Sequence, residues 1–158
     1  LKLTRDQQVD FLFTAGAFGL VIANNSSIAG AEGGCQAEVG SAAAMASASL
    51  VCAKGGTAQM AAEAISITLQ NMMGLVCDPV AGLVEVPCVK RNALGSSQAM
   101  ISADMALAGI TSVIPTDEVV EAMHQVGQKM PSIFKETAEG GLATTPTALK
   151  LKKEIFGD

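Results

Sequence analysis

The sequence predicts an all-α fold, and three observations support this prediction. Signals that start and end helices recur along the chain, whereas the apolar–polar alternation of half-buried strands does not. Hydrophobic residues make up 49% of the 158 residues and charged residues 16%, which is enough apolar material for a core. Aromatic residues reach only 3%, so Ala, Val, Leu, Ile and Met must fill that core. We therefore expect one compact domain of about six helices over residues 1–158.

The first two helices are expected over residues 4–21 and 36–53. Thr4 is a favourable N-cap for the first, with Asp6 in its first turn. The run 11–31 carries no charge, but its Asn, Ser and Gly residues favour a buried helix over a membrane span. The second helix contains Cys52, which is expected to be a small buried hydrophobe.

Gly, Pro and Thr bound the remaining elements. A third helix is expected over 57–73, after a Gly-Gly pair, and a fourth over 92–110, apolar on most sides and therefore central. A fifth follows over 116–129, and a last one begins at a Thr-Pro pair at 145. The segment 77–88 holds two prolines and a glycine, which predicts an irregular loop that contains cysteine.

Charge and composition exclude some classes of protein. The net charge of −5 and the lack of Trp and Tyr argue against binding to nucleic acid, which needs basic surfaces or stacking platforms. No basic-then-apolar signal segment opens the chain, so a cytoplasmic protein with reduced thiols and no membrane contact is expected. The missing initiator Met suggests a piece of a longer protein.

Three of the four cysteines lie at the ends of predicted elements or in loops. Cys35 stands at a helix start, and Cys77 and Cys88 bound the irregular segment, close to the basic pair Lys90 and Arg91. Such surroundings favour thiolates, which bind soft metals and iron–sulfur clusters. No Cys-x-x-Cys pair occurs, which counts against zinc ribbons and ferredoxin-type sites. Three thiolates would leave one iron of a cubane cluster open as a Lewis acid.

Two long motifs resemble one enzyme family. Residues 27–40, SIAGAEGGCQAEVG, resemble the first cysteine motif in the α domain of iron–sulfur-dependent L-serine dehydratases. Residues 77–92, CDPVAGLVEVPCVKRN, are similar to the paired-cysteine segment of that family. Gly140-Gly141-Leu142-Ala143 with Thr145-Pro146-Thr147 is similar to its closing segment. The resemblance covers nearly the whole chain.

The resemblance implies a cofactor, a reaction and partners. It implies a [4Fe–4S] cluster held by Cys35, Cys77 and Cys88, no pyridoxal phosphate, and conversion of L-serine to pyruvate and ammonia with the cluster as Lewis acid. It also implies a β domain or β subunit as partner and a homo-oligomer. The chain corresponds to the C-terminal part of an α subunit, because the upstream Gly-rich segment and the β domain of the family are absent, and it is expected to be inactive alone.

Four polar residues are candidates for substrate binding, each with a structural alternative. Arg91 has the chemistry to clamp a carboxylate or offset cluster charge, or else forms a surface ion pair. Asn92 contacts substrate or sulfide, or is a helix N-cap. Asn25 and Ser27 contact substrate, or are selected by turn chemistry alone.

Other polar residues leave the catalytic base unassigned. Glu32 and Glu38 flank Cys35 as a base or as neighbours of the cluster, although acidic residues near a helix start are favoured by the helix dipole anyway. His124 is expected to be solvated. The alternatives to a serine dehydratase are a related cluster lyase such as a cysteine desulfidase, and a non-catalytic helical module that binds a partner.

Overall fold

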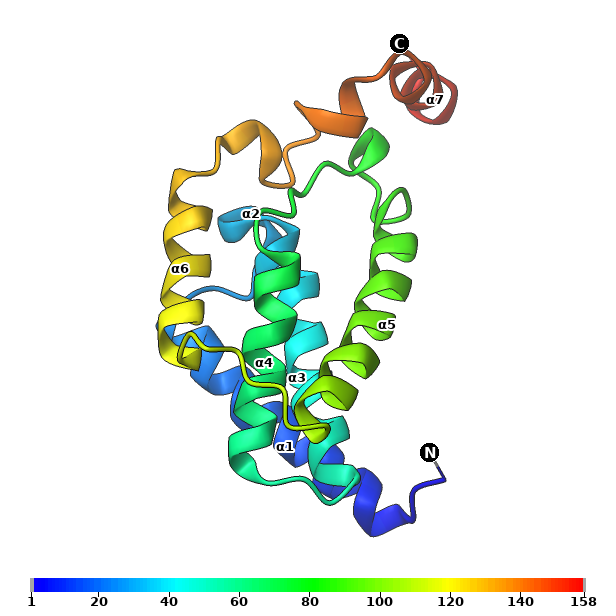
Figure 1. Cartoon of the computed structure of the whole chain (residues 1–158). Coiled ribbons are helices and arrows are strands. Elements are labelled where there is room, and N and C mark those ends of the chain that lie inside the picture. Colours follow the sequence, from blue (N-terminus) through cyan, green and yellow to red (C-terminus); the bar gives the residue numbers. More distant parts are fainter. Residues whose placement is uncertain (1, 158) are drawn as a thin grey trace.

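The computed structural model describes residues 2–157 and contains seven α-helices within that range (Figure 1). These are α1 (Arg5–Asn25), α2 (Gly30–Gly33), α3 (Ser41–Ala53), α4 (Ala58–Met72), α5 (Cys88–Leu107), α6 (Thr116–Lys129) and α7 (Pro146–Phe156). A π-helix at Gln36–Gly40 leads into α3, and 3₁₀ turns occur at Val80–Gly82, Ser132–Phe134 and Gly141–Thr144. Extended pairing in the described range is limited to one bridge between Cys77 and Lys135. The all-α prediction is confirmed.

Side-chain caps fix the starts of three helices. The Thr4 side chain accepts a hydrogen bond from Gln7 N–H, while the Gln7 side chain accepts one from Thr4 N–H, which forms a capping box. Thr57 and Thr145 likewise accept bonds from the backbone three residues later. These caps confirm the helix starts predicted at Thr4, Thr57 and Thr145.

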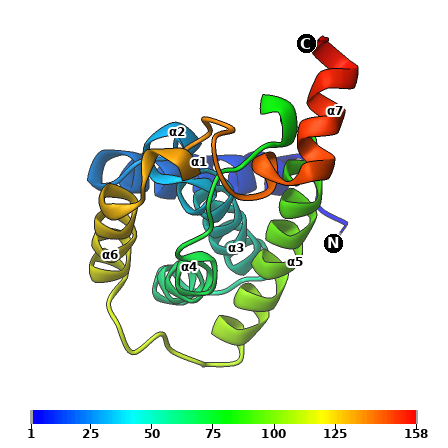
Figure 2. The ribbon, with the colours of Figure 1, turned by 90° about the horizontal axis from the view of Figure 1, so that it is seen from above.

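Helix α3 lies at the centre of the bundle and packs against α1, α4 and α5, while α6 covers the far side of α4 (Figures 1 and 2). Alanines at the helix contacts include Ala44, Ala48, Ala61, Ala64 and Ala103. Larger side chains fill the space between them, namely Ile22, Val51, Ile65, Leu69, Val119 and Met123. Burial of each such side chain stabilises the fold by about 1.5–3 kcal/mol.

Three burial predictions are wrong. Helix α5 is peripheral rather than central, and its Leu94, Met100 and Ile101 are exposed. Helix α1 is not buried as a whole, since only Gly19 and Ile22 of it are buried. Cys52 is exposed in the last turn of α3. Composition that is apolar all round does not say which side of a helix meets the core.

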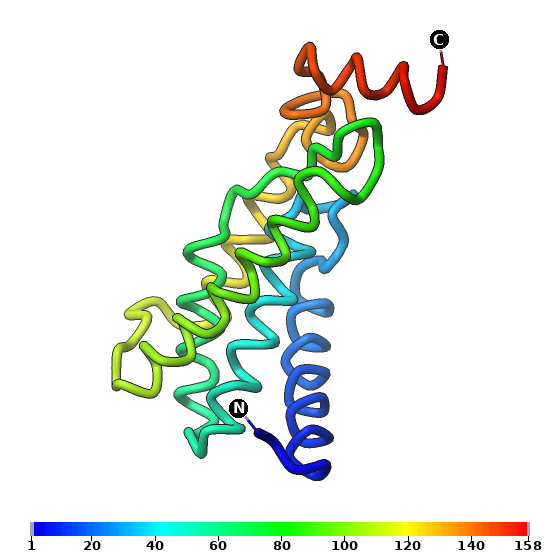
Figure 3. Tube along the Cα trace, turned by 90° about the vertical axis from the view of Figure 1, so that its right-hand side faces the viewer, coloured from blue at the N-terminus to red at the C-terminus, as the bar shows by residue number. Residues whose placement is uncertain are grey.

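One end of the bundle carries α7 and two of the long connections, and the other end carries the start of α1 (Figures 1 and 3). Helix α7 packs against the turns Val80–Gly82 and Gly141–Thr144 and projects from the bundle, at the opposite end from the start of α1 (Figure 3). The connections between α4 and α5 and between α6 and α7 gather at the same end as α7. None of the helices in the described range has the length and hydropathy of a membrane span.

Candidate functional site

The three predicted metal-binding cysteines all lie in segments at the α7 end of the bundle. Cys35 directly follows Gly34 after α2, Cys77 lies in the connection after α4, and Cys88 is the first residue of α5. The Sγ atoms of Cys35 and Cys77 and a carboxylate oxygen of Glu38 all lie within 4.8 Å of one another. The Cys88 thiol is close enough to Cys35 for their charges to interact. All three thiols are buried and free, whereas the fourth, Cys52, lines a separate hollow beside α1.

Gln36 fixes the Cys35 segment to two helices. Its side chain is buried, its Oε1 accepts a hydrogen bond from Gly74 N–H at 2.8 Å, and its Nε2 donates to the Met123 carbonyl at 3.0 Å. The Gln36 N–H also donates to the Leu75 carbonyl at 2.9 Å. The end of α4 and the middle of α6 therefore hold Cys35 in place. Sequence reasoning missed this role, because a glutamine beside a cysteine carries no signal of distant partners.

The backbone of Cys77 is held on both sides. Its N–H donates to the Phe134 carbonyl at 2.8 Å, and its carbonyl accepts a hydrogen bond from Glu136 N–H at 2.9 Å. Glu136 has a φ of +65°, so the chain turns sharply immediately after this pairing. The pairing joins the connection after α4 to the connection after α6.

Arg91 forms a buried ion pair beside the thiols. Its Nη1 lies 2.8 Å from Asp78 Oδ1, and the two side chains are only 14% and 4% exposed. The same Nη1 donates to the Val76 carbonyl at 2.7 Å and to Cys35 Sγ at 3.7 Å. Burial disfavours the charged guanidinium, but the adjacent Asp78 carboxylate more than offsets this, so the pKa of Arg91 is raised. The surface ion pair considered from the sequence is therefore wrong, and Arg91 places positive charge next to Cys35.

Burial and neighbouring charges raise the pKa of two of the thiols, Cys77 and Cys88. Burial raises the pKa of Cys77, and the neighbouring Cys35, Glu136 and Glu38 raise it further. Burial and the charge of Cys35 also raise the pKa of Cys88, which Arg91 lowers in part. A bound cation would reverse this balance, because metal binding releases protons from thiols. Three buried thiols beside an arginine thus match the donors that a soft metal or an iron–sulfur cluster requires.

The other candidate residues lie apart from the thiols or serve the backbone. Helix α5 begins at Cys88 rather than at 92, so Asn92 is not an N-cap and its Nδ2 donates to the Cys88 carbonyl at 2.9 Å. Pro87 occupies the N-cap position instead. Asn25 is exposed at the end of α1 and donates to the Val21 carbonyl. Ser27 donates to Glu32 Oε2 at 2.5 Å and accepts from Ala29 N–H, as in a turn.

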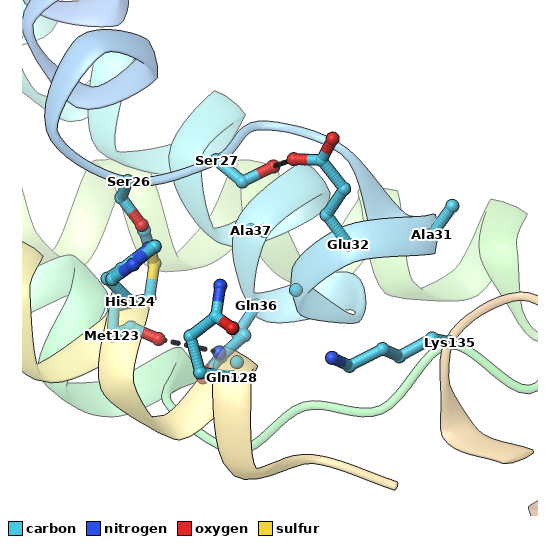
Figure 4. Close-up of a pocket in the computed structure, with 12 residues that line it drawn as sticks. Ser26, Ser27, Ala31, Glu32, Gln36, Ala37, Met123, His124, Gln128 and Lys135 are labelled. Atoms are coloured by element: carbon cyan, nitrogen blue, oxygen red, sulfur yellow. Dashed lines mark hydrogen bonds between the residues drawn. The ribbon is translucent and has the colours of Figure 1, made fainter. Parts of the chain in front are cut away.

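A pocket of about 380 Å³ lies between α2 and α6, beside the segment that carries Cys35 (Figure 4). Its lining includes Ser27, Glu32, Gln36, His124, Gln128 and Lys135. Figure 4 shows the hydrogen bond from Ser27 to Glu32 and the hydrogen bond from Gln36 to the Met123 carbonyl. His124 is half-buried in the pocket wall rather than fully solvated. The cysteine thiols are not among the lining residues, so the pocket is separate from the thiol cluster.

Comparison with known proteins places the chain in a family. Residues 1–143 match the family described as serine dehydratase alpha chain. The chain is 68% identical over 157 residues to the probable L-serine dehydratase alpha chain of Bacillus subtilis. This match spans 99% of this chain and 52% of that protein. It is 61% identical over 157 residues to the probable L-serine dehydratase alpha chain of Latilactobacillus sakei, and this match spans 99% of this chain and 75% of that protein. It is 54% identical over 149 residues to the L-serine dehydratase alpha chain of Peptoniphilus asaccharolyticus, with coverage of 94% and 51%. The chain spans about half the length of the first and third of these relatives, and it belongs to the serine dehydratase alpha chain family.

Proposed function

We propose that this chain forms the cluster-binding part of an L-serine dehydratase, which converts L-serine to pyruvate and ammonia. The observation that carries the proposal is the closeness of Cys35 and Cys77, whose Sγ atoms lie within 4.8 Å of each other, with Arg91, from the first turn of the helix that begins at Cys88, donating to Cys35 Sγ. Family membership and the names of the relatives support the reaction.

The proposed cofactor is a [4Fe–4S] cluster held by Cys35, Cys77 and Cys88, without pyridoxal phosphate. The donor chemistry fits, because the three thiols are buried, unpaired in disulfides and next to a guanidinium. When bound, such a cluster supplies a Lewis acid that stabilises negative charge on a departing hydroxyl oxygen.

The surrounding residues fix the positions of the three thiols and set the charge and solvent exposure around them. The Arg91 Nη1 donates a hydrogen bond to Cys35 Sγ at 3.7 Å, which places a guanidinium against the first sulfur. Asp78 holds Arg91 in place and is itself held by the Leu142 N–H at 2.7 Å. The backbone bonds of Cys77 to Phe134 and Glu136 keep the second thiol fixed. Burial of all three sulfurs excludes bulk water from them.

The proposal includes partners. The relatives are named alpha chains, which implies a β chain or β domain, and the stretches that those relatives have beyond this match are expected to complete the site. The segment alone is therefore expected to be inactive. L-Serine is the proposed substrate. The assembled enzyme is proposed to form a homo-oligomer and to act in the cytoplasm. Arg91 and Asn92 lie near the thiols, so they remain better candidates for a substrate role than Asn25 and Ser27.

An anaerobic assay tests the function. The full-length α chain, assembled with its β partner and reconstituted with iron and sulfide, is expected to form pyruvate from L-serine. Cys35→Ser is expected to lower kcat by more than about 100-fold, because even residues that only support a metal ligand contribute 10–100-fold. Cys52→Ser is the matched control and keeps full activity, since Cys52 lies apart from the other thiols. Faster release of sulfide from L-cysteine than of pyruvate from L-serine would instead identify a cysteine desulfidase.

A further inference from the structure

We propose that the Glu38 carboxylate is a fourth donor of this metal centre, an oxygen ligand for the iron that three cysteines leave open. The inference rests on the proposed function and concerns the state without substrate. From the sequence, the helix dipole alone accounts for an acidic residue at this position, near the start of a helix. The inference gives Glu38 a further role.

The position of Glu38 follows from the local helix. Cys35 is the N-cap residue of the π-helix Gln36–Gly40, and Glu38 lies within it, three residues later. A Glu38 carboxylate oxygen lies within 4.8 Å of the Sγ atoms of both Cys35 and Cys77. Among the described residues, this is the one cluster of three His, Cys, Asp or Glu side chains with metal-binding spacing.

Gly30 leaves the space that this arrangement needs. A Cβ atom on Gly30 would lie 2.8 Å from Glu38 Oε2 and 3.3 Å from Cys77 Sγ. Contacts below 3.0 Å force a neighbour to move, so a side chain at this buried position would push the Glu38 carboxylate away from Cys77. The absence of a side chain thus allows carboxylate and thiol to lie next to each other.

A second carboxylate, Glu136, is close but placed differently. Its Oε2 would lie 3.5 Å from the same Cβ. A Glu38 carboxylate oxygen, in contrast, lies within 4.8 Å of the Sγ atoms of Cys35 and Cys77. Glu38 therefore lies beside the sulfurs of both Cys35 and Cys77, whereas Glu136 is not part of that cluster.

The chemistry of a carboxylate suits an exchangeable ligand. Carboxylate oxygens are established ligands of iron in proteins. The Glu38 side chain is exposed although the two thiols beside it are buried, so it can leave without disturbing the core. At a bound cluster, Glu38 would thus be the donor that a substrate oxygen displaces.

Oxidative loss of the open iron tests the inference. The full-length α chain with its β partner is reconstituted anaerobically and treated with ferricyanide, which takes one electron from [4Fe–4S]²⁺ as one Fe²⁺ leaves and [3Fe–4S]⁺ remains. Electron paramagnetic resonance follows the [3Fe–4S]⁺ signal. Glu38→Gln is expected to speed its appearance by roughly 10-fold or more, because even the loss of a group that only supports a ligand weakens metal binding by 10–100-fold. Glu38→Asp is expected to restore part of the wild-type rate.

Glu136→Gln is the matched control, because it removes one carboxylate charge from the same neighbourhood. It is expected to lose iron at the wild-type rate. Equal rates for wild type and Glu38→Gln, or acceleration by Glu136→Gln alone, would overturn the assignment while leaving the proposed function intact. A wild-type protein that forms no cluster would overturn the proposed function and this inference with it.

Discussion

Replacing Arg91 with methionine is expected to lower the free energy of unfolding of the metal-free chain by about 3–5 kcal/mol. Removal of the guanidinium leaves the Asp78 carboxylate, only 4% exposed, without its counter-charge. The Val76 carbonyl also loses its hydrogen bond from Nη1. Urea denaturation of the reduced proteins, followed by circular dichroism, measures the difference.

Lys54→Met is the matched control for this experiment. It also removes one cation from an ion pair, but the Lys54 and Asp104 side chains are 33% and 66% exposed. Exposed pairs contribute about 0–1 kcal/mol, so the control is expected to lose no more than that. Equal losses in the two variants would show that the Arg91–Asp78 pair does not organise the connection after α4.

Replacing Gly141 with alanine is expected to lower the free energy of unfolding by about 3–5 kcal/mol through two effects. Gly141 has a φ of +61°, where an alanine costs about 1–2 kcal/mol. Its Cβ would also collide with the Asp78 carboxylate and lie 2.8 Å from Asp78 Cβ. Displacement of Asp78 weakens its ion pair with Arg91 and its bond from Leu142 N–H, which accounts for the remainder.

Gly109→Ala separates these two effects. Gly109 has a φ of +85°, but a Cβ there would meet no atom within 4 Å. Only the backbone strain applies, so a loss of about 1–2 kcal/mol is expected. Thermal unfolding of both variants gives the comparison, and a Gly141→Ala loss as small as that of Gly109→Ala would contradict the proposed role of Asp78.

The helices were predictable where the signal is local. Thr4, Thr57 and Thr145 cap their helices through bonds to residues three positions later, which the sequence displays directly. The start of α5 was misplaced, because Pro87 precedes a helix that begins at Cys88, and a proline at that position also fits a loop. Burial on α1 and α5 was not predictable, since their apolar residues surround the helix instead of forming one face.

The candidate site was only partly predictable for the same physical reason. The three cysteines were identified from their motifs, and Glu38 was a candidate neighbour of the cluster because it flanks Cys35 in the sequence. The proximity of Glu38 to Cys77, and the burial of Arg91 against Asp78, depend on how distant segments pack. The hydrogen bonds of Gln36 to Gly74 and Met123 likewise join residues far apart in the sequence, so they also depend on tertiary packing.

Iron and acid-labile sulfide content after anaerobic reconstitution is the most direct test of the metal centre. The full-length α chain is expected to bind about four irons and four sulfides. The Cys88→Ser variant is expected to lose most of both, while Cys52→Ser keeps them, because Cys52 lies on the exposed end of α3. Absence of iron from the wild-type protein, or equal iron in wild type and Cys88→Ser, would contradict a cluster held by Cys35, Cys77 and Cys88.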